Sequence, residues 1–123
     1  MVLDYNFDFK GDCPMDIKDI SIKLKIWLEY EGEQIMGPGL FRLFKKIQET
    51  GSLSNAAKEC GYSYKYAWSK IKKVEERCQT SFVITSKGGI GGGGSMELTD
   101  FALKILSLYE EKLKLLENRE FDL

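Results

Sequence analysis

Residues 51–78 read GSLSNAAKECGYSYKYAWSKIKKVEERC, and this stretch decides the fold. It predicts a short helix that begins after Ser52 or Ser54 and a second helix over residues 64–78 that Ser63 caps. Gly61 stands between the two helices, at a tight turn that suits the conformational freedom of glycine. Two helices joined at a glycine turn are typical of the helix-turn-helix.

The apolar residues of the stretch fit the same interpretation. Ala57 is small, as the close approach of a second helix requires, and Leu53 and Ile71 are placed to fill the angle between the helices. The apolar face of the second helix is expected to comprise Tyr64, Ala67, Ile71, Val74 and Cys78, with Trp68 beside it and Tyr62 also in or near the core. Taken alone, the pattern also fits two packed helices that bind nothing.

The flanking segments predict the rest of a small domain. Apolar residues alternate with polar residues over 22–30, which predicts a half-buried strand, and residues 34–36 are expected to form a short return strand. Leu40, Leu43, Phe44 and Ile47 have the spacing of an amphipathic helix that ends at Gly51.

Downstream, the sequence predicts a hairpin and a last helix. Strands over 82–85 and 96–99 flank a glycine-rich tip, so residues 86–96 are expected to form a wing. Thr99 is expected to cap a helix that ends near Asn118.

The fold class expected is mainly α with a small β component: a winged helix-turn-helix with an N-terminal strand, a glycine-rich wing hairpin and a long C-terminal dimerisation helix. The expected organisation is an N-terminal arm over 1–19, a winged helix-turn-helix domain over 20–98, and a C-terminal helix with its tail over 99–123.

The last helix carries apolar residues that step by four and three, as in a coiled-coil seam. This helix has more apolar surface than a winged-helix body needs, so it is expected to form a homodimer. The predicted dimer interface comprises Ala102, Ile105, Leu106, Tyr109, Leu113 and Leu116.

Charge is unevenly distributed along the chain. The 123 residues have a formal net charge of -1, yet residues 62–87 carry six cations and two anions, a local net charge of +4. A solvated lysine-rich helix face is common, but it does not explain why the remaining residues are acidic. The concentration of positive charge therefore favours a polyanionic partner, double-stranded DNA. The predicted DNA-binding residues are Ser52, Ser54, Ser63, Lys65, Tyr66, Ser69, Lys70, Lys73, Lys87, Gly91 and Gly92.

The same composition argues against an enzyme. The chain has no histidine, and its three cysteines, an odd number, lack the spacing of a zinc site or a disulfide framework. Gly89, Gly91 and Gly94 match a dinucleotide-binding glycine pattern, but no alternating strand-helix order surrounds them. We therefore expect no catalytic residues, no metal site and no cofactor. No apolar run is long enough to cross a membrane and no secretory signal is visible, so a cytoplasmic protein is expected.

Residues 51–58 (GSLSNAAK), 61–68 (GYSYKYAW) and 88–94 (GGIGGGG) together resemble the N-terminal DNA-binding domain of ModE-type molybdate-responsive regulators, which is itself LysR-like. Leu98 and Thr99 resemble the exit from the wing into the final helix, and the resemblance covers roughly residues 20–117. It implies a prokaryotic winged-helix transcription factor that dimerises on a palindromic operator, with residues 64–78 as the recognition helix.

The chain departs from that family in two places. Ile90 stands where the wing of ModE-like proteins commonly carries a lysine, and the printed sequence ends at Leu123 without a molybdate-binding region. The resemblance therefore does not carry molybdate sensing over, and the effector is unknown. The alternative function is a winged-helix module that binds a protein partner instead of specific DNA.

Overall fold

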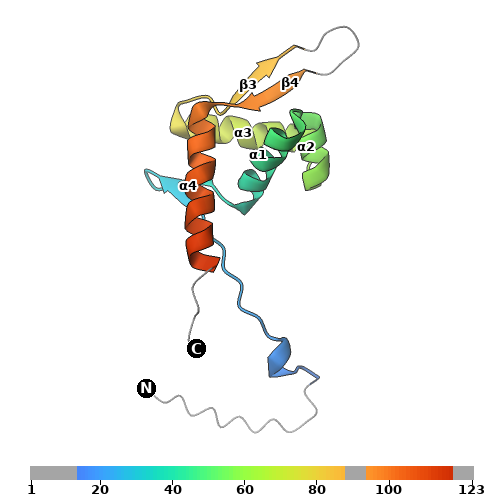
Figure 1. Ribbon diagram of the computed structural model, residues 1–123, viewed down its shortest axis with the longest axis vertical. Helices are drawn as coiled ribbons and strands as arrows, with labels where there is room; N and C mark the ends of the chain where they lie inside the picture. The colour runs from blue at the N-terminus through green and yellow to red at the C-terminus, as the bar shows by residue number, and fades with distance from the viewer. Residues whose placement is uncertain (1–13, 88–93, 118–123) are drawn as a thin grey trace.

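A computed structural model of the 123-residue chain describes residues 14–87 and 94–117. In these ranges three helices, two small hairpins and a long last helix form one body, and residues 14–27 lead away from it (Figure 1). In chain order the elements are η1 (Ile17–Asp19), β1 (Leu28–Tyr30), β2 (Glu33–Met36), α1 (Pro38–Thr50), α2 (Leu53–Cys60), α3 (Tyr64–Cys78), β3 (Val83–Ser86), β4 (Ser95–Leu98) and α4 (Asp100–Glu117).

Local signals determine where α2 and α3 begin and end. The hydroxyl of Ser52 accepts a hydrogen bond from Asn55 N (3.2 Å) and that of Ser63 accepts one from Tyr66 N (3.1 Å). Gly51 and Gly61 end α1 and α2 in the left-handed conformation, with φ of 67° and 75°. The predicted capping serine Ser63 and the predicted glycine turn are confirmed, and Ser52 rather than Ser54 caps α2.

A continuous core connects these helices. Leu53, Ala57 and Ile71 are buried at the junction of α2 and α3, as their spacing predicts. Phe82, from the segment that leads into β3, is fully buried, and its ring lies 5.6 Å from that of Phe44 in α1. The three helices and the base of the wing therefore share one apolar centre.

The wing is joined to the body by backbone hydrogen bonds. β3 pairs with β4 in an antiparallel register from Val83↔Leu98 to Ser86↔Ser95. Met96 N donates to Gly51 O (2.8 Å), and Thr99 N donates to Phe82 O (3.0 Å). The base of the hairpin is thus held against the α1–α2 turn and the start of α4.

The first half of α4 belongs to the same core. Thr99 caps the helix through Ala102 N (3.1 Å), as predicted, and Tyr109 packs on Phe41 with ring centroids 4.8 Å apart. The Tyr109 hydroxyl donates to Ile26 O (3.0 Å). Burial raises the pKa of this hydroxyl above its usual value, so it stays protonated as the donor.

The strand predicted over residues 22–30 is wrong for most of its length, because β1 covers only Leu28–Tyr30. Its partner β2 ends at Met36, which pairs with Leu28, and Gly37 then begins α1. Residues 22–27 consequently have no neighbouring strand within residues 14–87 and 94–117. Alternating residues indicate an extended backbone, but a strand also requires a partner.

Ser52 and Ser54 provide a matched test of the capping assignment. Ser52→Ala removes the acceptor for Asn55 N and should reduce the free energy of unfolding by about 1 kcal/mol. Ser54→Ala, two residues further on at an exposed position, should change it by less than about 0.5 kcal/mol. Urea unfolding followed by circular dichroism measures both, and equal losses in the two variants would contradict the assignment.

Candidate nucleic-acid interface

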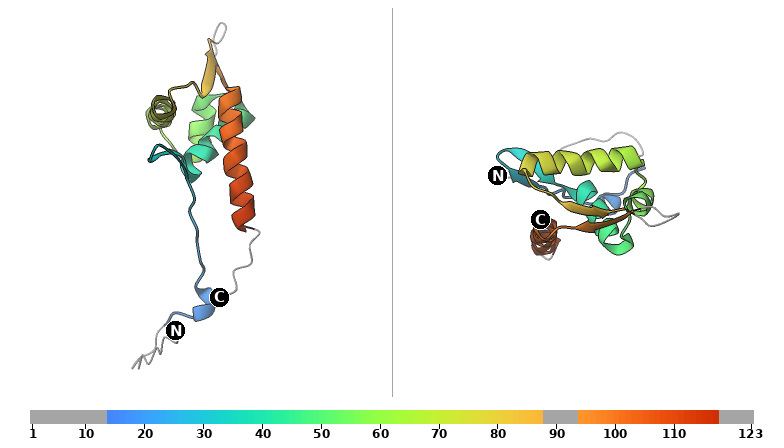
Figure 2. Two further views of the ribbon diagram at one scale, coloured as in Figure 1. Left: turned by 90° about the vertical axis from the view of Figure 1, so that its left-hand side faces the viewer. Right: turned by 90° about the horizontal axis from the view of Figure 1, so that it is seen from above.

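Helix α3 lies on the outside of the body, on the side away from α4 (Figure 2). Ala67, Ile71 and Val74 are buried beneath it, so the helical repeat directs its other side chains outward. Among the predicted DNA-binding residues of α3 and its N-cap, Lys70 is half-buried. The exposed ones are Ser63, Lys65, Tyr66, Ser69 and Lys73.

The cations of α3 divide into two groups. Lys72 pairs with Glu75 (3.3 Å) and Arg77 pairs with Glu33 (3.6 Å). Lys65, Lys70 and Lys73 pair with no carboxylate in the described parts of the chain. The three lysines predicted to bind DNA are thus those whose charge remains available to a ligand.

Aromatic rings support two of the lysines. The Tyr66 ring stands edge-on to Tyr62, with centroids 5.1 Å apart, and the ammonium of Lys70 lies 5.2 Å from the Tyr66 centroid. This arrangement holds Lys70 beside the exposed face of α3. Lys72 lies 4.5 Å from the centroid of Trp68, which is half-buried as predicted.

Tyr64 differs from the prediction that it packs in or at the edge of the core, since 59% of it is exposed. It is the first residue of α3, one turn before Ala67 begins the buried stripe. Spacing alone placed it on the apolar face, but the core does not extend to the end of the helix.

The predicted serines are not equivalent. Ser52 and Ser63 use a hydroxyl oxygen to accept a capping hydrogen bond, which leaves each hydroxyl proton available to an anion. Ser54 is exposed. Ser69 instead donates its proton to Tyr66 O (2.8 Å), so in this structure it offers no donor to a phosphate.

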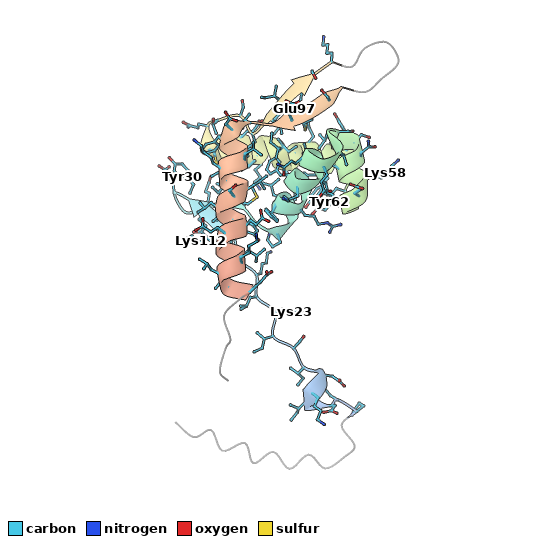
Figure 3. The ribbon with its side chains drawn as sticks, viewed as in Figure 1. Lys23, Tyr30, Lys58, Tyr62, Glu97 and Lys112 are labelled. Atoms are coloured by element: carbon cyan, nitrogen blue, oxygen red, sulfur yellow. The ribbon has the colours of Figure 1, made fainter. Side chains whose placement is uncertain are left out.

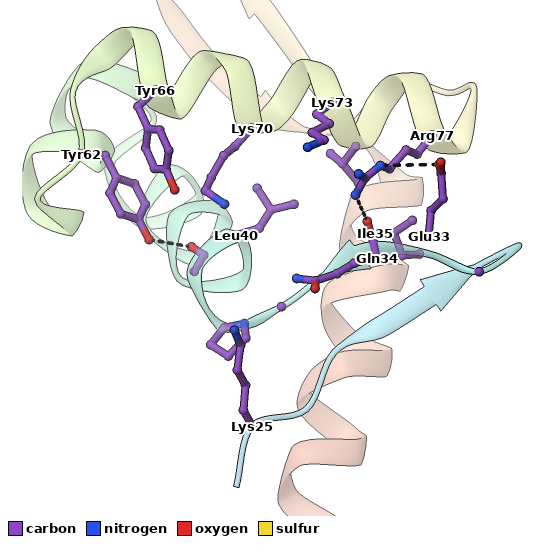
Figure 4. A pocket seen from close by; sticks show the side chains of 15 residues that line it. Lys25, Glu33, Gln34, Ile35, Leu40, Tyr62, Tyr66, Lys70, Lys73 and Arg77 are labelled. Carbon is purple, nitrogen blue, oxygen red and sulfur yellow. Dashed lines mark hydrogen bonds and ion pairs between the residues drawn. The ribbon is translucent and has the colours of Figure 1, made fainter. Parts of the chain in front are cut away.

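A groove of about 660 Å³ runs along one side of α3, opposite the start of α1 and the end of β2 (Figure 4). Tyr66, Lys70 and Lys73 point toward it from α3, and Lys25 stands at its other rim. We call it the basic groove. The sequence-based reasoning missed Lys25, whose only signal was its place in the alternating segment.

The start of α1 adds backbone donors to the basic groove. Gly37, the N-cap, provides no capping side chain, and Pro38 has no N–H, so the N–H groups of Gly39 and Leu40 are the first without a helical acceptor. A Cβ at Gly39 would lie 2.9 Å from Tyr62 Oη, so a larger residue there would displace the Tyr62 side chain at this end of the groove. Backbone N–H groups and ammonium groups together favour an anion.

Two polar contacts fix the neighbours of α3. Arg77 donates to Gln34 O as well as pairing with Glu33, which ties β2 to the end of α3. Glu75 accepts a hydrogen bond from Phe82 N (2.8 Å), which ties the wing segment to the same helix. The sequence analysis counted Arg77 in the positive charge of this region, but in the structure its guanidinium is used in contacts with β2.

Part of the wing lies outside the described residues. Lys87 is exposed at the end of β3, and the hydroxyls of Ser86 and Ser95 contact each other across the hairpin. The predicted contacts Gly91 and Gly92, together with Ile90, fall outside the described ranges.

The predicted dimer interface requires a correction. Ala102, Leu106 and Tyr109 are buried in the core of their own domain, so they are not available to a partner. Ile105, Leu113 and Leu116 are half-buried. Phe101, Leu108 and Leu115, spaced by seven residues, form an exposed apolar stripe that the four-three pattern did not single out.

No described helix is long and apolar enough to cross a membrane. Within residues 14–87 and 94–117, no cluster of three or more Cys, Asp or Glu residues could hold a metal ion.

Residues 39–103 match the family of bacterial regulatory helix-turn-helix proteins of the lysR type. The chain belongs to this family. The predicted resemblance to LysR-like and ModE-type regulators is thereby confirmed.

Similar proteins include the transcriptional regulator ModE of Yersinia pestis, 33% identical over 103 residues, and the DNA-binding transcriptional dual regulator ModE of Escherichia coli strain K12, 31% identical over the same length. Each alignment covers 84% of this chain and 38% of the relative, so the chain spans about two fifths of their length. The crystal structure of ArgP from Mycobacterium tuberculosis, at 21% identity and a TM-score of 0.51, covers 68% of this chain and 29% of that one. It supports the winged-helix fold.

The contact between Glu75 and Phe82 can be tested against its exposed neighbour. Glu75→Ala leaves the Phe82 N–H without its acceptor and should reduce the free energy of unfolding by about 1–3 kcal/mol. Glu76→Ala, which makes the same charge change at an exposed position, should cost less than about 0.5 kcal/mol. Urea unfolding separates the two cases, and a neutral Glu75→Ala variant would show that the contact does not hold the wing.

Proposed function

We propose that this protein is a sequence-specific DNA-binding transcriptional regulator that acts as a homodimer, with α3 in the major groove. The observation that carries the proposal is the set of unpaired lysines, Lys65, Lys70 and Lys73, on the exposed face of α3. Membership of the lysR-type helix-turn-helix family supports the same function, as does similarity to ModE of Escherichia coli, a DNA-binding transcriptional dual regulator.

The proposed contacts follow from the chemistry of each group. Lys65 and Lys70 can donate to guanine or to phosphate, and Tyr66 can contact a sugar or a thymine methyl group. Ser52, Ser54 and Ser63 lie at or near helix N-termini, where hydroxyl and backbone donors position a phosphate.

The basic groove is proposed to receive the DNA backbone beside the major groove. Lys73 and the N–H groups of Gly39 and Leu40 supply an ammonium and two backbone donors there. A phosphodiester in the groove would fix the register of α3 on the duplex without reading sequence.

Lys87 and the glycine-rich wing, including Gly91 and Gly92, are proposed to contact the flanking backbone or minor groove. Dimerisation is proposed to use the apolar residues of α4 outside the domain core. They are Phe101, Ile105, Leu108, Leu113, Leu115 and Leu116. A two-fold dimer implies a palindromic operator, since each recognition helix reads one half-site.

Lysine variants test direct DNA contact by α3. Lys65→Ala and Lys70→Ala should each weaken binding to the DNA upstream of the protein's own gene by about 1–3 kcal/mol. Lys112→Ala is the control. The substitution removes the same charge, but Lys112 projects from α4 and not from α3 (Figure 3). Fluorescence anisotropy with unrelated competitor DNA measures all three.

If the wild-type protein binds both DNAs equally and weakly, sequence-specific recognition is contradicted. If the α3 variants and Lys112→Ala lose the same affinity, the effect is one of overall charge and not of contact. Retention of a protein partner by the α3 variants would then favour the alternative function as an interaction module.

The basic groove has a separate prediction in its salt dependence. Lys73→Gln should reduce the slope of log K against log salt by about 0.9, the value for one lost phosphate contact. Lys104→Gln on α4 removes the same charge outside the groove and should leave the slope unchanged. Anisotropy titrations at four salt concentrations measure the slopes, and equal slopes for wild type and Lys73→Gln would exclude a phosphate contact by Lys73.

A further inference from the structure

The segment that leads into β1 exposes a regular row of aliphatic side chains. Ile20, Ile22 and Leu24 are 60%, 61% and 61% exposed, although they alternate with polar residues as in a half-buried strand. No hydrogen bond joins the backbone of residues 21–25 to another described residue. We call residues 19–25 the arm; from here on this name no longer refers to the N-terminal arm expected over residues 1–19.

The arm precedes β1 and extends beyond the end of β2, so no strand of the described residues lies beside it. The alternating apolar positions of the arm continue to Ile26, which is half-buried against the core. The carbonyl of Ile26 accepts a hydrogen bond from the Tyr109 hydroxyl. After Asp19 the arm is therefore a segment without regular structure that leads into the core, and among the described residues its backbone groups are unpaired and its apolar side is exposed. Such a segment can pair with a strand from another chain.

We propose that the arms of two copies of this chain pair as antiparallel strands about a two-fold axis at Ile22. The inference rests on the homodimer of the proposed function and adds a specific contact to it. The two-fold axis places Ile22 opposite the partner's Ile22 and Ile20 opposite the partner's Leu24. Every aliphatic residue of the row then faces an aliphatic residue, which is the pairing that stabilises a sheet.

The polar side of the arm supports this register and a second copy as the partner. With the axis at Ile22, Lys23 faces the partner's Ser21, and Lys25 lies beside the partner's Asp19, the last residue of η1, so opposite charges come close. An axis at Ser21 would instead leave Leu24 opposite the partner's η1, without an aliphatic partner. An axis at Lys23 would place this lysine opposite the partner's Lys23. Side-chain alternation and charge together thus select the register centred on Ile22.

The position of the arm is compatible with the same dimer. It leaves the body beside α4, as both views show (Figures 1 and 2), and α4 carries the exposed stripe of Phe101, Leu108 and Leu115. One two-fold axis can cover both apolar surfaces. Because Lys25 also lines the basic groove, pairing of the arms would hold this rim of the groove in place.

Disulfide crosslinking tests the register directly. In the Ile22→Cys variant, the two new thiols face each other with Cα atoms about 5 Å apart, within the range of a disulfide. In the Leu24→Cys variant the equivalent thiols stand about 13 Å apart along the strands, which is too far. Both variants are made in a Cys13→Ser background, since Cys60 is buried and Cys78 half-buried.

After mild oxidation with diamide, non-reducing electrophoresis should show most of the Ile22→Cys protein as a covalent dimer. The Leu24→Cys protein and the background protein should stay almost entirely monomeric on the gel. Equal crosslinking of the two cysteine variants, or crosslinking of neither, would overturn the proposed pairing.

A second measurement separates this inference from the proposed function. Ile22→Lys places two ammonium groups face to face and should raise the dimer dissociation constant at least about tenfold, measured by sedimentation velocity. Thermal unfolding should be unchanged at a concentration where both proteins are monomeric, because Ile22 is exposed in the single chain.

If the wild-type protein is a dimer whose dissociation constant Ile22→Lys leaves unchanged, the arm pairing is wrong and the homodimer of the proposed function stands. If the wild-type protein is monomeric at every concentration, the pairing and the homodimer both fail. DNA binding, measured separately by anisotropy, then decides the remainder of the proposed function.

Discussion

Phe82 joins the elements on which the DNA-binding surface depends. Its buried ring lies 5.6 Å from Phe44 in α1 and 5.4 Å from Phe101 in α4. Its N–H donates to Glu75 in α3, and its carbonyl accepts from Thr99 at the start of α4. One residue thus contacts α1, α3 and α4 and joins them to the base of the wing. Loss of its ring would leave a cavity where all of them meet.

The distribution of charge distinguishes the outer face of α3 from the rest of the domain. A chain with a net charge of -1 cannot attract DNA through its overall charge. Ion pairs with Glu75 and Glu33 neutralise Lys72 and Arg77, which support the structure around α3. Lys65, Lys70 and Lys73 keep their charge on the outer face and along the basic groove. The arrangement concentrates positive potential where α3 is exposed.

The apolar surfaces that remain exposed are equally informative. α4 uses Ala102, Leu106 and Tyr109 within its own core, and its stripe of Phe101, Leu108 and Leu115 stays open to solvent. The aliphatic row of the arm lies on the same molecule without cover. Apolar surface of this regularity is costly in water, and association of two copies removes it from solvent. In the proposed homodimer, these two segments would link dimerisation to the geometry of DNA recognition.

The sequence by itself determined the features that depend on neighbouring residues. Ser63 and Thr99 begin helices and Gly51 and Gly61 end them, because capping and left-handed turns are local hydrogen-bonding and steric effects. The spacing of Leu40, Leu43, Phe44 and Ile47 defined α1 for the same reason. The exposed lysines of α3 could also be identified, because the helical repeat fixes which positions lie on the buried face and which on the exposed face.

Only the tertiary structure decided what depends on distant partners. Alternation predicted a strand over 22–30, but β2 pairs with just three of these residues, and a strand needs a partner that sequence does not specify. The apolar pattern of α4 did not show which of its residues would be buried in the core of the domain. Counting charges did not show that Arg77 pairs with Glu33 of β2. Lys25 and the start of α1 reach the basic groove through contacts between segments far apart in the chain. Such contacts follow from how the elements pack, and local sequence carries no direct record of that packing.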